Sequence, residues 1–363
     1  MKAVVYHRTG GPEVLELVES DSLPEPGHGE VRVRIVVSGV NPTDWKARAG
    51  SGASVELEHP QTPNQDGSGV IDAIGPAVQR FSVGDRVWIR DAAYQRPSGT
   101  ATEFAVLPET LVNPLPAGLS FDVGASLGIP ALTAHRALTS HEVAPARLSP
   151  GSLVGHTVLV AGGAGAVGHA AIQLAVWAGA TVITTVSSEL KADLAWRAGA
   201  HHVIDYHTED VVARVAAVAP NGVSIIVEVN PLANLGIDLQ MIATGGTIAI
   251  YVSGSPDELS VPARASMTKN VRYQFILTYT TSEVQKSNAV AAVGEAAAAG
   301  ALGVGDEFGL PLVRYLLSET GAAHRAVEDG VVGKMLIDVG PADPGNAVLD
   351  AQAAGLAPDG DAW

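Results

Sequence analysis

Three glycines, at positions 162, 165 and 168, separate two segments of very different character. Before them, Val158–Ala161 is an apolar run that includes two β-branched valines, and after them apolar residues recur at helical spacing through Ala170–Trp177. Glycines so placed permit a tight turn and a close approach of the backbone to a ligand. The helix that follows would offer free N–H groups and the positive end of its dipole to an anion. The segment therefore predicts a phosphate-binding turn of the kind that holds a dinucleotide.

The same glycines could also form an ordinary turn between a strand and a helix, because the chain contains 40 glycines. The neighbouring elements favour the dinucleotide interpretation. From Thr157 to Val252, short apolar strands alternate with helices, most of which end at glycine or proline, as helices commonly do. This alternation is typical of a doubly wound parallel sheet with helices on both faces. The predicted strands are 158–161, 181–186, 203–204, 224–229 and 247–252, and the predicted helices are 167–178, 190–198, 209–219 and 235–242.

The first part of the chain, to about residue 125, favours strands over helices. Val31–Val36 alternates apolar and polar side chains, as a half-buried strand does. Gly69–Gly75 and Arg86–Ile89 are short runs bounded by turn residues. Frequent glycine and proline indicate an irregular β-barrel. We further expect helices over 131–137, 282–299 and 322–329, strands over 312–317 and 334–339, and a loosely held tail over 341–363.

Composition excludes several classes of partner. With 47% hydrophobic and 17% charged residues among 363, the chain is typical of a globular protein that buries a sizeable core. Its net charge of −16 argues against binding to nucleic acid or to anionic membrane surfaces, which requires positive patches. We therefore expect a small-molecule partner, no nucleic acid and no membrane insertion.

The absence of cysteine excludes disulfides, thiolate catalysis and cysteine-ligated zinc. The opening residues, Met1–Tyr6, enter directly into a strand-like run without the longer apolar stretch of a signal peptide. No apolar run reaches the ~20 residues that a membrane-spanning helix needs. A cytoplasmic location is the expectation.

The chain resembles the zinc-free medium-chain dehydrogenases/reductases, in particular the quinone oxidoreductases of the zeta-crystallin type. The resemblance extends over nearly the whole length and rests on a series of motifs in a fixed order. They are Ser38–Asp44, Pro63–Val70, Val83–Val87, Gly99–Ala105, Gly128–Ala134, the glycine turn at 162–168 and Gly333–Met335.

The resemblance implies an α/β fold with two domains. One would be a GroES-like β-barrel catalytic domain made of residues 1–129 and 281–340, and therefore discontinuous in sequence. The other would be a Rossmann doubly wound parallel-sheet domain over 130–280 that binds NADPH.

The resemblance also implies that the reaction needs no metal. Zinc-dependent relatives carry a cysteine where this chain has Asn41, and a histidine and a glutamate where it has Gln65 and Asp66. A catalytic zinc needs three protein ligands, and neither an asparagine nor a glutamine supplies a thiolate or an imidazole. We therefore expect no metal site.

The end of the second predicted strand of the doubly wound region, at Val186, bears on the choice of cofactor. NAD-binding proteins usually carry an acidic residue there, whereas this chain has Ser187 and Ser188. By resemblance, Lys191 pairs with the 2′-phosphate of NADPH, with Tyr206 nearby. Two alternatives are open: Lys191 could be a solvated helix residue, and Glu189 could contact a ribose.

The resemblance assigns further residues to the cofactor. Asn41 and Thr133 would lie at its reactive end, Phe275–Leu277 would pass that end, and Lys334 closes the series of motifs. The complete set of expected cofactor-binding residues is Asn41, Thr133, Gly162, Ala164, Gly165, Ala166, Val167, Gly168, Ser187, Ser188, Lys191, Tyr206, Asn230, Tyr251, Phe275, Ile276, Leu277 and Lys334.

The expected catalytic residues are Asn41, Asp44 and Thr133, which line the cleft in the family. Without a metal, hydrogen bonds and position must activate the acceptor, and a quinone suits that arrangement because its reduction restores an aromatic ring. Asn41 and Asp44 could instead serve only the local fold, with Asp44 capping a helix that begins near Trp45. The expected substrate pocket comprises Trp45, Lys46, Gln65, Tyr94, Arg264 and Tyr279, with His135 and Phe275 as further aromatic candidates.

Three functions are consistent with these observations. The first is an NADPH:quinone oxidoreductase. The second is an NADPH-dependent alkenal or enone double-bond reductase on the same scaffold. The absence of a tyrosine from the segment after Asn41 counts instead against an enoyl-thioester reductase, a sister family that uses a tyrosine there as proton donor. The third is a non-catalytic, NADPH-binding protein similar to a crystallin. We also expect a homodimer or homotetramer, paired through an exposed strand at 247–252 or 271–279.

Overall fold

The computed structural model describes residues 1–253 and 258–340 and divides into two compact units. The first consists of Met1–Gly128 and the described residues from Val313 onward, and the second is Ile129–Leu312. The division differs from the expected one for residues 281–312. The reason is that helix α9 (Glu283–Ala298) packs on helices α3 (Ile129–Leu138) and α4 (Ala166–Trp177) of the second unit. The expected tail, 341–363, lies outside the described residues.

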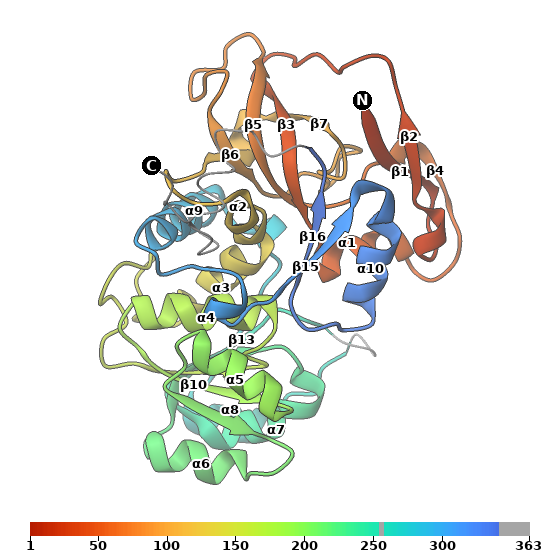
Figure 1. Ribbon diagram of the computed structural model, residues 1–363. Helices are drawn as coiled ribbons and strands as arrows, with labels where there is room; N and C mark the ends of the chain where they lie inside the picture. The colour runs from red at the N-terminus through yellow and green to blue at the C-terminus, as the bar shows by residue number, and fades with distance from the viewer. Residues whose placement is uncertain (254–257, 341–363) are drawn as a thin grey trace, which may run out of the picture. The chain divides into compact units, whose positions relative to one another are not determined.

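The first unit is built mainly of antiparallel strands (Figure 1). A seven-stranded sheet has the order β15-β16-β3-β5-β6-β8, with β7 paired to β3, and a smaller sheet has the order β2-β1-β4. Its strands are β1 (Lys2–Arg8), β2 (Glu16–Glu19), β3 (Glu30–Gly39), β4 (Glu56–Gln61), β5 (Asp66–Ile74), β6 (Arg86–Ile89), β7 (Phe104–Pro108), β8 (Val112–Pro114), β15 (Leu312–Leu316) and β16 (Lys334–Asp338), and its helices are α1 (Pro42–Ala49), α2 (Phe121–Leu127) and α10 (Thr320–Glu328).

Strand β3 shows why the sheet forms. Val31, Val33 and Ile35 alternate with arginines and are fully buried, so one face of the strand supplies the core while the other is partly exposed. Side chains from β5, β6, β7 and β8 complete that core. Strand β16, more than 290 positions later, then pairs antiparallel with β3 and adds the C-terminal segment to the sheet.

The second unit contains a six-stranded parallel sheet with the order β11-β10-β9-β12-β13-β14. This is the doubly wound order, which reverses between β9 and β12 and leaves a crevice at the carboxyl ends of the strands. Its strands are β9 (Thr157–Ala161), β10 (Thr181–Val186), β11 (His202–Asp205), β12 (Val223–Glu228), β13 (Ile242–Ile250) and β14 (Arg272–Phe275), and its further helices are α5 (Glu189–Arg197), α6 (Val211–Val218), α7 (Pro231–Met241) and α8 (Ala263–Lys269).

The sheet is buried because helices cover it. Helices α4 and α5, green in Figure 1, pack against β10, whereas α6 and α7 pack on each other and α7 packs on β12 and β13. Residues such as Ile183, Ile226 and Ile248 are fully buried in the resulting core. Strands covered in this way read as continuous apolar runs, which is why the sequence revealed them.

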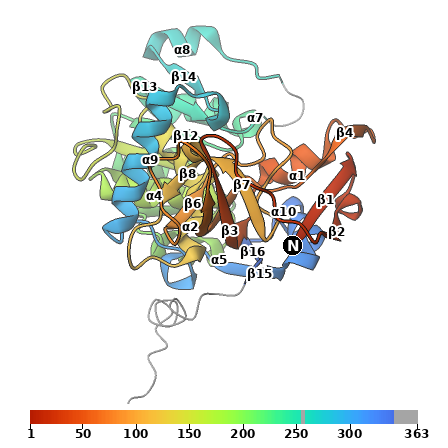
Figure 2. The ribbon, with the colours of Figure 1, turned by 90° about the horizontal axis from the view of Figure 1, so that it is seen from above.

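The expected position of one edge strand needs correction. Thr247–Val252 was expected to lie at an edge, but β13 lies between β12 and β14. Strand β14 is the edge on that side, within the expected 271–279 segment, and Ser266 of α8 is hydrogen-bonded to Tyr273 of β14 (Figure 2). Helix α7 also begins earlier than expected, at Pro231, because proline is well suited to the first turn of a helix.

None of the helices in the described residues is long and apolar enough to span a membrane.

Candidate functional site

The glycine turn of the second unit has the geometry of an anion cradle. Gly162 follows β9 with φ +69°, a left-handed conformation that glycine adopts without strain. A Cβ on Gly168 would lie 2.3 Å from the carbonyl oxygen of Gly162, so no larger residue fits where helix and turn cross. Gly165 is the N-cap of α4, whose first N–H groups therefore face the turn. Ala164, Ala166 and Val167 complete this segment at the crevice of the sheet.

A cavity of about 370 Å³ adjoins the turn. It opens at the carboxyl ends of β9, β10 and β12, the position at which doubly wound sheets bind ligands. Both the volume and the mix of apolar walls with few polar groups are typical of a small-molecule site. The lining residues are Leu159, Ala161, Gly162, Thr185, Tyr206, Val211, Glu228, Val229, Asn230, Ala233, Asn234, Ile237, Asp238 and Met241.

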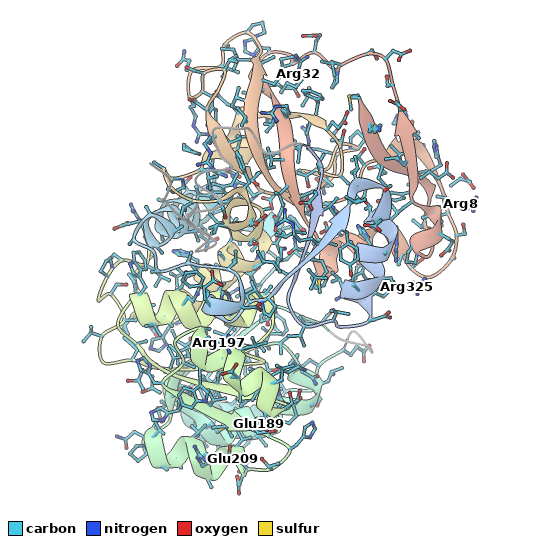
Figure 3. The ribbon with its side chains drawn as sticks, in the orientation of Figure 1. Arg8, Arg32, Glu189, Arg197, Glu209 and Arg325 are labelled. Carbon is cyan, nitrogen blue, oxygen red and sulfur yellow. The ribbon has the colours of Figure 1, made fainter. Side chains whose placement is uncertain are left out.

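The end of β10 carries hydroxyl groups and an ammonium group. Lys191 Nζ donates to Ser187 Oγ at 2.9 Å, and the backbone N–H of Lys191 donates to Ser188, the N-cap of α5. Tyr206 lies at the end of the neighbouring strand β11, half exposed at the cavity, with its ring 4.6 Å from that of His207. Glu189 occupies the first turn of α5 (Figure 3). The structure thus brings Ser187, Lys191 and the strand end together.

Two buried carboxyl groups line the same cavity. Glu228, the last residue of β12, is fully buried and accepts hydrogen bonds from the backbone N–H of Asn230 and from Asn234 Nδ2 at 3.0 Å. Asp238 on α7 is 1% exposed and faces Glu228. Burial, and then the charge of Glu228, raise the pKa of Tyr251, which follows β13. Asn230, one of the expected cofactor-binding residues, also lines the cavity, whereas Glu228, Asn234 and Asp238 were not among the expected residues.

A second polar cluster lies inside the first unit, around Asn41. Asn41 Nδ2 donates to Asp66 Oδ2 at 2.7 Å, and Lys334 Nζ donates to Asn41 Oδ1 at 2.7 Å and to the Val40 carbonyl at 3.1 Å. A carboxylate on one side and an ammonium on the other fix the orientation of the amide, because the reversed amide would face two repulsive contacts. Lys334 is only 2% exposed, so its ammonium group is used within this cluster.

Asp44 belongs to the same cluster through the backbone. Its carboxylate accepts from the N–H of Asn41 at 2.7 Å and from the N–H of Gln65 at 3.0 Å. Burial, and then the charge of Asp66, raise the pKa of Asp44 to about 8, although both hydrogen bonds and Lys334 oppose the shift. The expected cap is corrected here: α1 begins at Pro42 with Asn41 as N-cap, and Asp44 is its third residue, bonded back to the Asn41 N–H.

The loop that carries Gln65 and Asp66 is supported by a chain of buried hydrogen bonds. Asn64, with φ +78°, bonds through its side chain to His324 Nε2 at 2.9 Å and to Ser38 Oγ at 2.9 Å. Thr100 Oγ1 continues the chain to the Asp66 carbonyl at 2.6 Å. Burial, and then the nearby Arg48, lower the pKa of His324 to about 3, so this histidine is neutral and its Nε2 donates to Asn64.

The other expected pocket residues of the first unit are less closely grouped. Gln65 is 4% exposed and accepts from the Ala93 N–H through its side chain. Lys46 Nζ lies 5.8 Å above the ring of Trp45 on α1. Tyr94 is half-buried on the turn that follows β6.

The remaining expected residues lie in the second unit. Thr133 is buried on α3, which packs against the short turn that holds Tyr279, itself 8% exposed. His135 on the same helix accepts from the Leu148 N–H, and burial lowers its pKa to about 4. Arg264 is exposed on α8. After β14, Ile276 is buried, whereas Phe275 and Leu277 are 59% and 55% exposed.

Sequence reasoning missed the roles of Glu228, Asp238, Asn64 and His324. For Glu228 a signal was available, because a carboxylate that ends an apolar strand is costly to bury without a purpose. For His324 no signal was available, because its partner Asn64 lies 260 positions away.

Among the described residues, no group of three or more His, Asp or Glu side chains is placed to hold a metal ion. The glycine turn, by contrast, fits a dinucleotide. Because Gly168 has no side chain, the helix packs closely on the turn and the backbone N–H groups stay accessible to a pyrophosphate. The adjoining cavity has room for a nucleoside.

Comparison with known proteins agrees with both units. Residues 27–117 match the family model described as alcohol dehydrogenase GroES-like domain, and residues 166–293 match the model described as zinc-binding dehydrogenase. The quinone oxidoreductase of Lama guanicoe is 32% identical over 345 residues, which cover 93% of this chain and 97% of that protein.

Solved structures are similar over the same extent. A crystal structure of an NAD-dependent alcohol dehydrogenase is 30% identical, covers 94% of this chain and 100% of its own, and has a TM-score of 0.80. A mycobacterial protein solved in complex with NADPH is 31% identical, with coverages of 93% and 99% and a TM-score of 0.76.

Proposed function

Because the chain belongs to the quinone oxidoreductase family of the medium-chain dehydrogenases/reductases, we propose that it is an NADPH-dependent quinone oxidoreductase that works without a metal. The single observation that carries the proposal is the similarity to a quinone oxidoreductase over 93% of the chain. The relative is named a quinone oxidoreductase. The arrangement of this chain's own residues supports the proposal that it has the same activity.

The choice of NADPH is supported by the end of β10. A 2′-phosphate needs positive charge and hydrogen-bond donors, and Lys191 and Ser187 supply both, whereas an acidic residue at that point would repel it. The N–H groups at the start of α4 would bind the pyrophosphate. Tyr206 and Asn230 would contact the adenosine at the cavity. When bound, a reduced nicotinamide supplies a hydride for the acceptor.

The acceptor's oxygen needs a hydrogen-bond donor, because negative charge develops on it as the quinone is reduced. Asn41 Nδ2 carries two N–H groups, of which Asp66 accepts one, and the second suits a quinone oxygen. Lys334 and Asp66 hold the amide in that orientation before any substrate arrives. Such preorganisation favours the transition state because the donor does not have to reorient. Thr133 and Asp44 are the other residues that we propose for the reacting end.

The proposal is tested by measuring the oxidation of NADPH by the purified protein with a panel of quinones and a panel of enals and enones, each repeated with NADH. We expect turnover with quinones and a clear preference for NADPH. Turnover with enals alone would assign the alkenal or enone reductase activity instead. Binding of NADPH without any turnover would indicate a non-catalytic protein.

The cofactor preference has its own test in Lys191→Ala. Loss of a charge-assisted contact to the 2′-phosphate should raise KM for NADPH about tenfold and leave KM for NADH unchanged. Lys286→Ala, in α9 of the same unit, is the matched control and should change neither. Equal rates with NADH and NADPH in the unaltered protein would contradict the assignment.

A further inference from the structure

Glu228 and Asp238 form a buried pair of carboxyl groups that the proposed reaction does not use. Glu228 ends β12 and is 0% exposed, and Asp238 lies on α7 and is 1% exposed. The two groups are within hydrogen-bonding reach of each other. Both line the cavity next to the glycine turn. A pair of like charges so placed would be costly, because buried carboxylates lose their hydration and repel each other.

The hydrogen bonds of the pair show where a proton is needed. Glu228 Oε1 accepts from the backbone N–H of Asn230 and from Asn234 Nδ2. Glu228 Oε2 and Asp238 Oδ2, both buried, have no donor among the residues described. Two acceptor oxygens that face each other become a hydrogen bond only if one of them carries a proton.

Among the described residues, two cations on neighbouring helices are engaged elsewhere. On α6, which packs on α7, Arg214 is ion-paired with Glu209. Lys269 of α8 donates to the carbonyl oxygens of Gln240 and Ile242. Tyr251, beyond β13, is neutral because burial and Glu228 raise its pKa. A proton shared by the two carboxyl groups would limit the charge of this site without a cation.

Burial, and then the charge of Glu228, raise the pKa of Asp238 to about 8, and burial also raises the pKa of Glu228. These directions agree with the geometry, in which the hydrogen bonds from Asn230 and Asn234 favour the charge on Glu228 and leave the proton on Asp238.

We propose that Glu228 and Asp238 hold one proton between them and in that state position Asn230 and Asn234 at the wall of the nucleotide pocket. The inference rests on the proposed function in that the occupant of the pocket is the nucleotide of NADPH. Asp238 is a positioning residue: it acts through Glu228, which fixes the start of α7. Loss of the proton leaves two repelling charges, so Glu228 releases the two asparagines and the pocket loses its shape.

The experiment measures the dissociation constant of NADPH and the thermal unfolding midpoint between pH 7 and 9.5. In the unaltered protein we expect affinity to weaken at least tenfold over this range, with a midpoint near pH 8, because only the protonated pair binds well. The unfolding midpoint should fall as the pH rises toward 8 and level off above it, because only the folded state holds the extra proton below pH 8.

Asp238→Asn is the decisive variant, because its amide donates to Glu228 Oε2 and does not titrate. We expect it to bind NADPH with little dependence on pH. In Glu228→Gln, the amide at position 228 donates to the Asp238 carboxylate instead. This variant replaces Asp238→Asn in the experiment if Asp238→Asn does not fold. Asp193→Asn is the matched control: it makes the same change on the exposed face of α5, where Asp193 pairs with Arg197, and should retain the original profile.

The two hypotheses fail differently. Identical pH profiles of affinity in the unaltered protein and Asp238→Asn would overturn the positioning role. Absence of NADPH binding at every pH would overturn the proposed function. In that case the unfolding midpoint still decides whether a proton is shared, because its decline as the pH rises from 7 to about 8 must vanish in Asp238→Asn.

Discussion

Asn41 and Lys334 show how a single polar residue acquires a defined role. An isolated asparagine amide can face either way, but here its oxygen meets the Lys334 ammonium and its nitrogen meets the Asp66 carboxylate. Burial lowers the pKa of Lys334, whereas Asp66 and Asp44 oppose that shift. The buried charges therefore depend on one another, and removal of Lys334 would take away the positive charge that interacts with Asp66 and Asp44.

This dependence leads to a prediction for Lys334→Met. The substitution preserves most of the volume but removes the positive charge that interacts with Asp66 and Asp44, and it removes the donor to Asn41 Oδ1. We expect the free energy of unfolding, measured in urea, to decrease by about 3 kcal/mol. Lys2→Met, at an exposed position, should change it by less than about 0.5 kcal/mol. A loss no larger than that of Lys2→Met would contradict the interpretation.

His324 makes a prediction about pH. Its pKa is about 3 in the folded protein, against an ordinary value near 6.5, so between these values only the unfolded state takes up the proton. Acidification from pH 6.5 therefore favours unfolding through this residue, by up to ~1.4 kcal/mol per pH unit. His324→Gln should unfold with a weaker dependence on pH between 6.5 and 4.5. Equal slopes for the two proteins would show that His324 is protonated in the folded state. The raised pKa of Asp44 acts in the opposite direction in both proteins and cancels in the comparison.

At the scale of elements, the close contact between the glycine turn and α4 depends on a glycine at position 168. Gly168→Ala introduces a Cβ 2.3 Å from a backbone oxygen, so the helix has to move away from the turn. We expect loss of NADPH binding, measured by fluorescence titration, with the protein still folded.

Gly294→Ala provides the control for that substitution. This glycine lies within α9, and a Cβ there would meet no atom within 4 Å. The substitution should retain NADPH binding and stabilise the protein by about 0.5–1 kcal/mol, because alanine loses less conformational entropy in a helix. If both variants bind NADPH equally well, the turn does not hold the pyrophosphate.

At the scale of the whole molecule, the edge of the six-stranded sheet leads to a proposal about assembly. Strand β14 pairs with β13 along one side, and the adjacent segments expose Met267, Phe275 and Leu277. An unpaired edge with apolar neighbours favours association, so we expect a homodimer or homotetramer. Analytical ultracentrifugation should show it, and Met267→Glu should shift it toward the monomer. A monomeric unaltered protein would contradict the proposal.

The sequence revealed most of the fold because its signals were local. The doubly wound region alternates apolar strands with helices that stop at glycine, and the observed strands β9, β10 and β12 lie within one residue of the predicted ones. The division into units was predicted less well, since 281–312 joins the second unit by packing α9 on α3, a contact between segments about 150 positions apart. Periodicity in a helix shows which face is apolar but not what covers it.

The sequence by itself therefore determined the elements, the glycine turn and the absence of a carboxylate at the end of β10, because each depends on residue types within a short segment. Only the tertiary structure decided which polar groups meet: Asn41 with Asp66 and Lys334, and Glu228 with Asp238. Their effects on charge and pKa arise from burial and from contacts at distances of a few ångströms. Those distances follow from the way the chain packs, which the order of residues along it does not show directly.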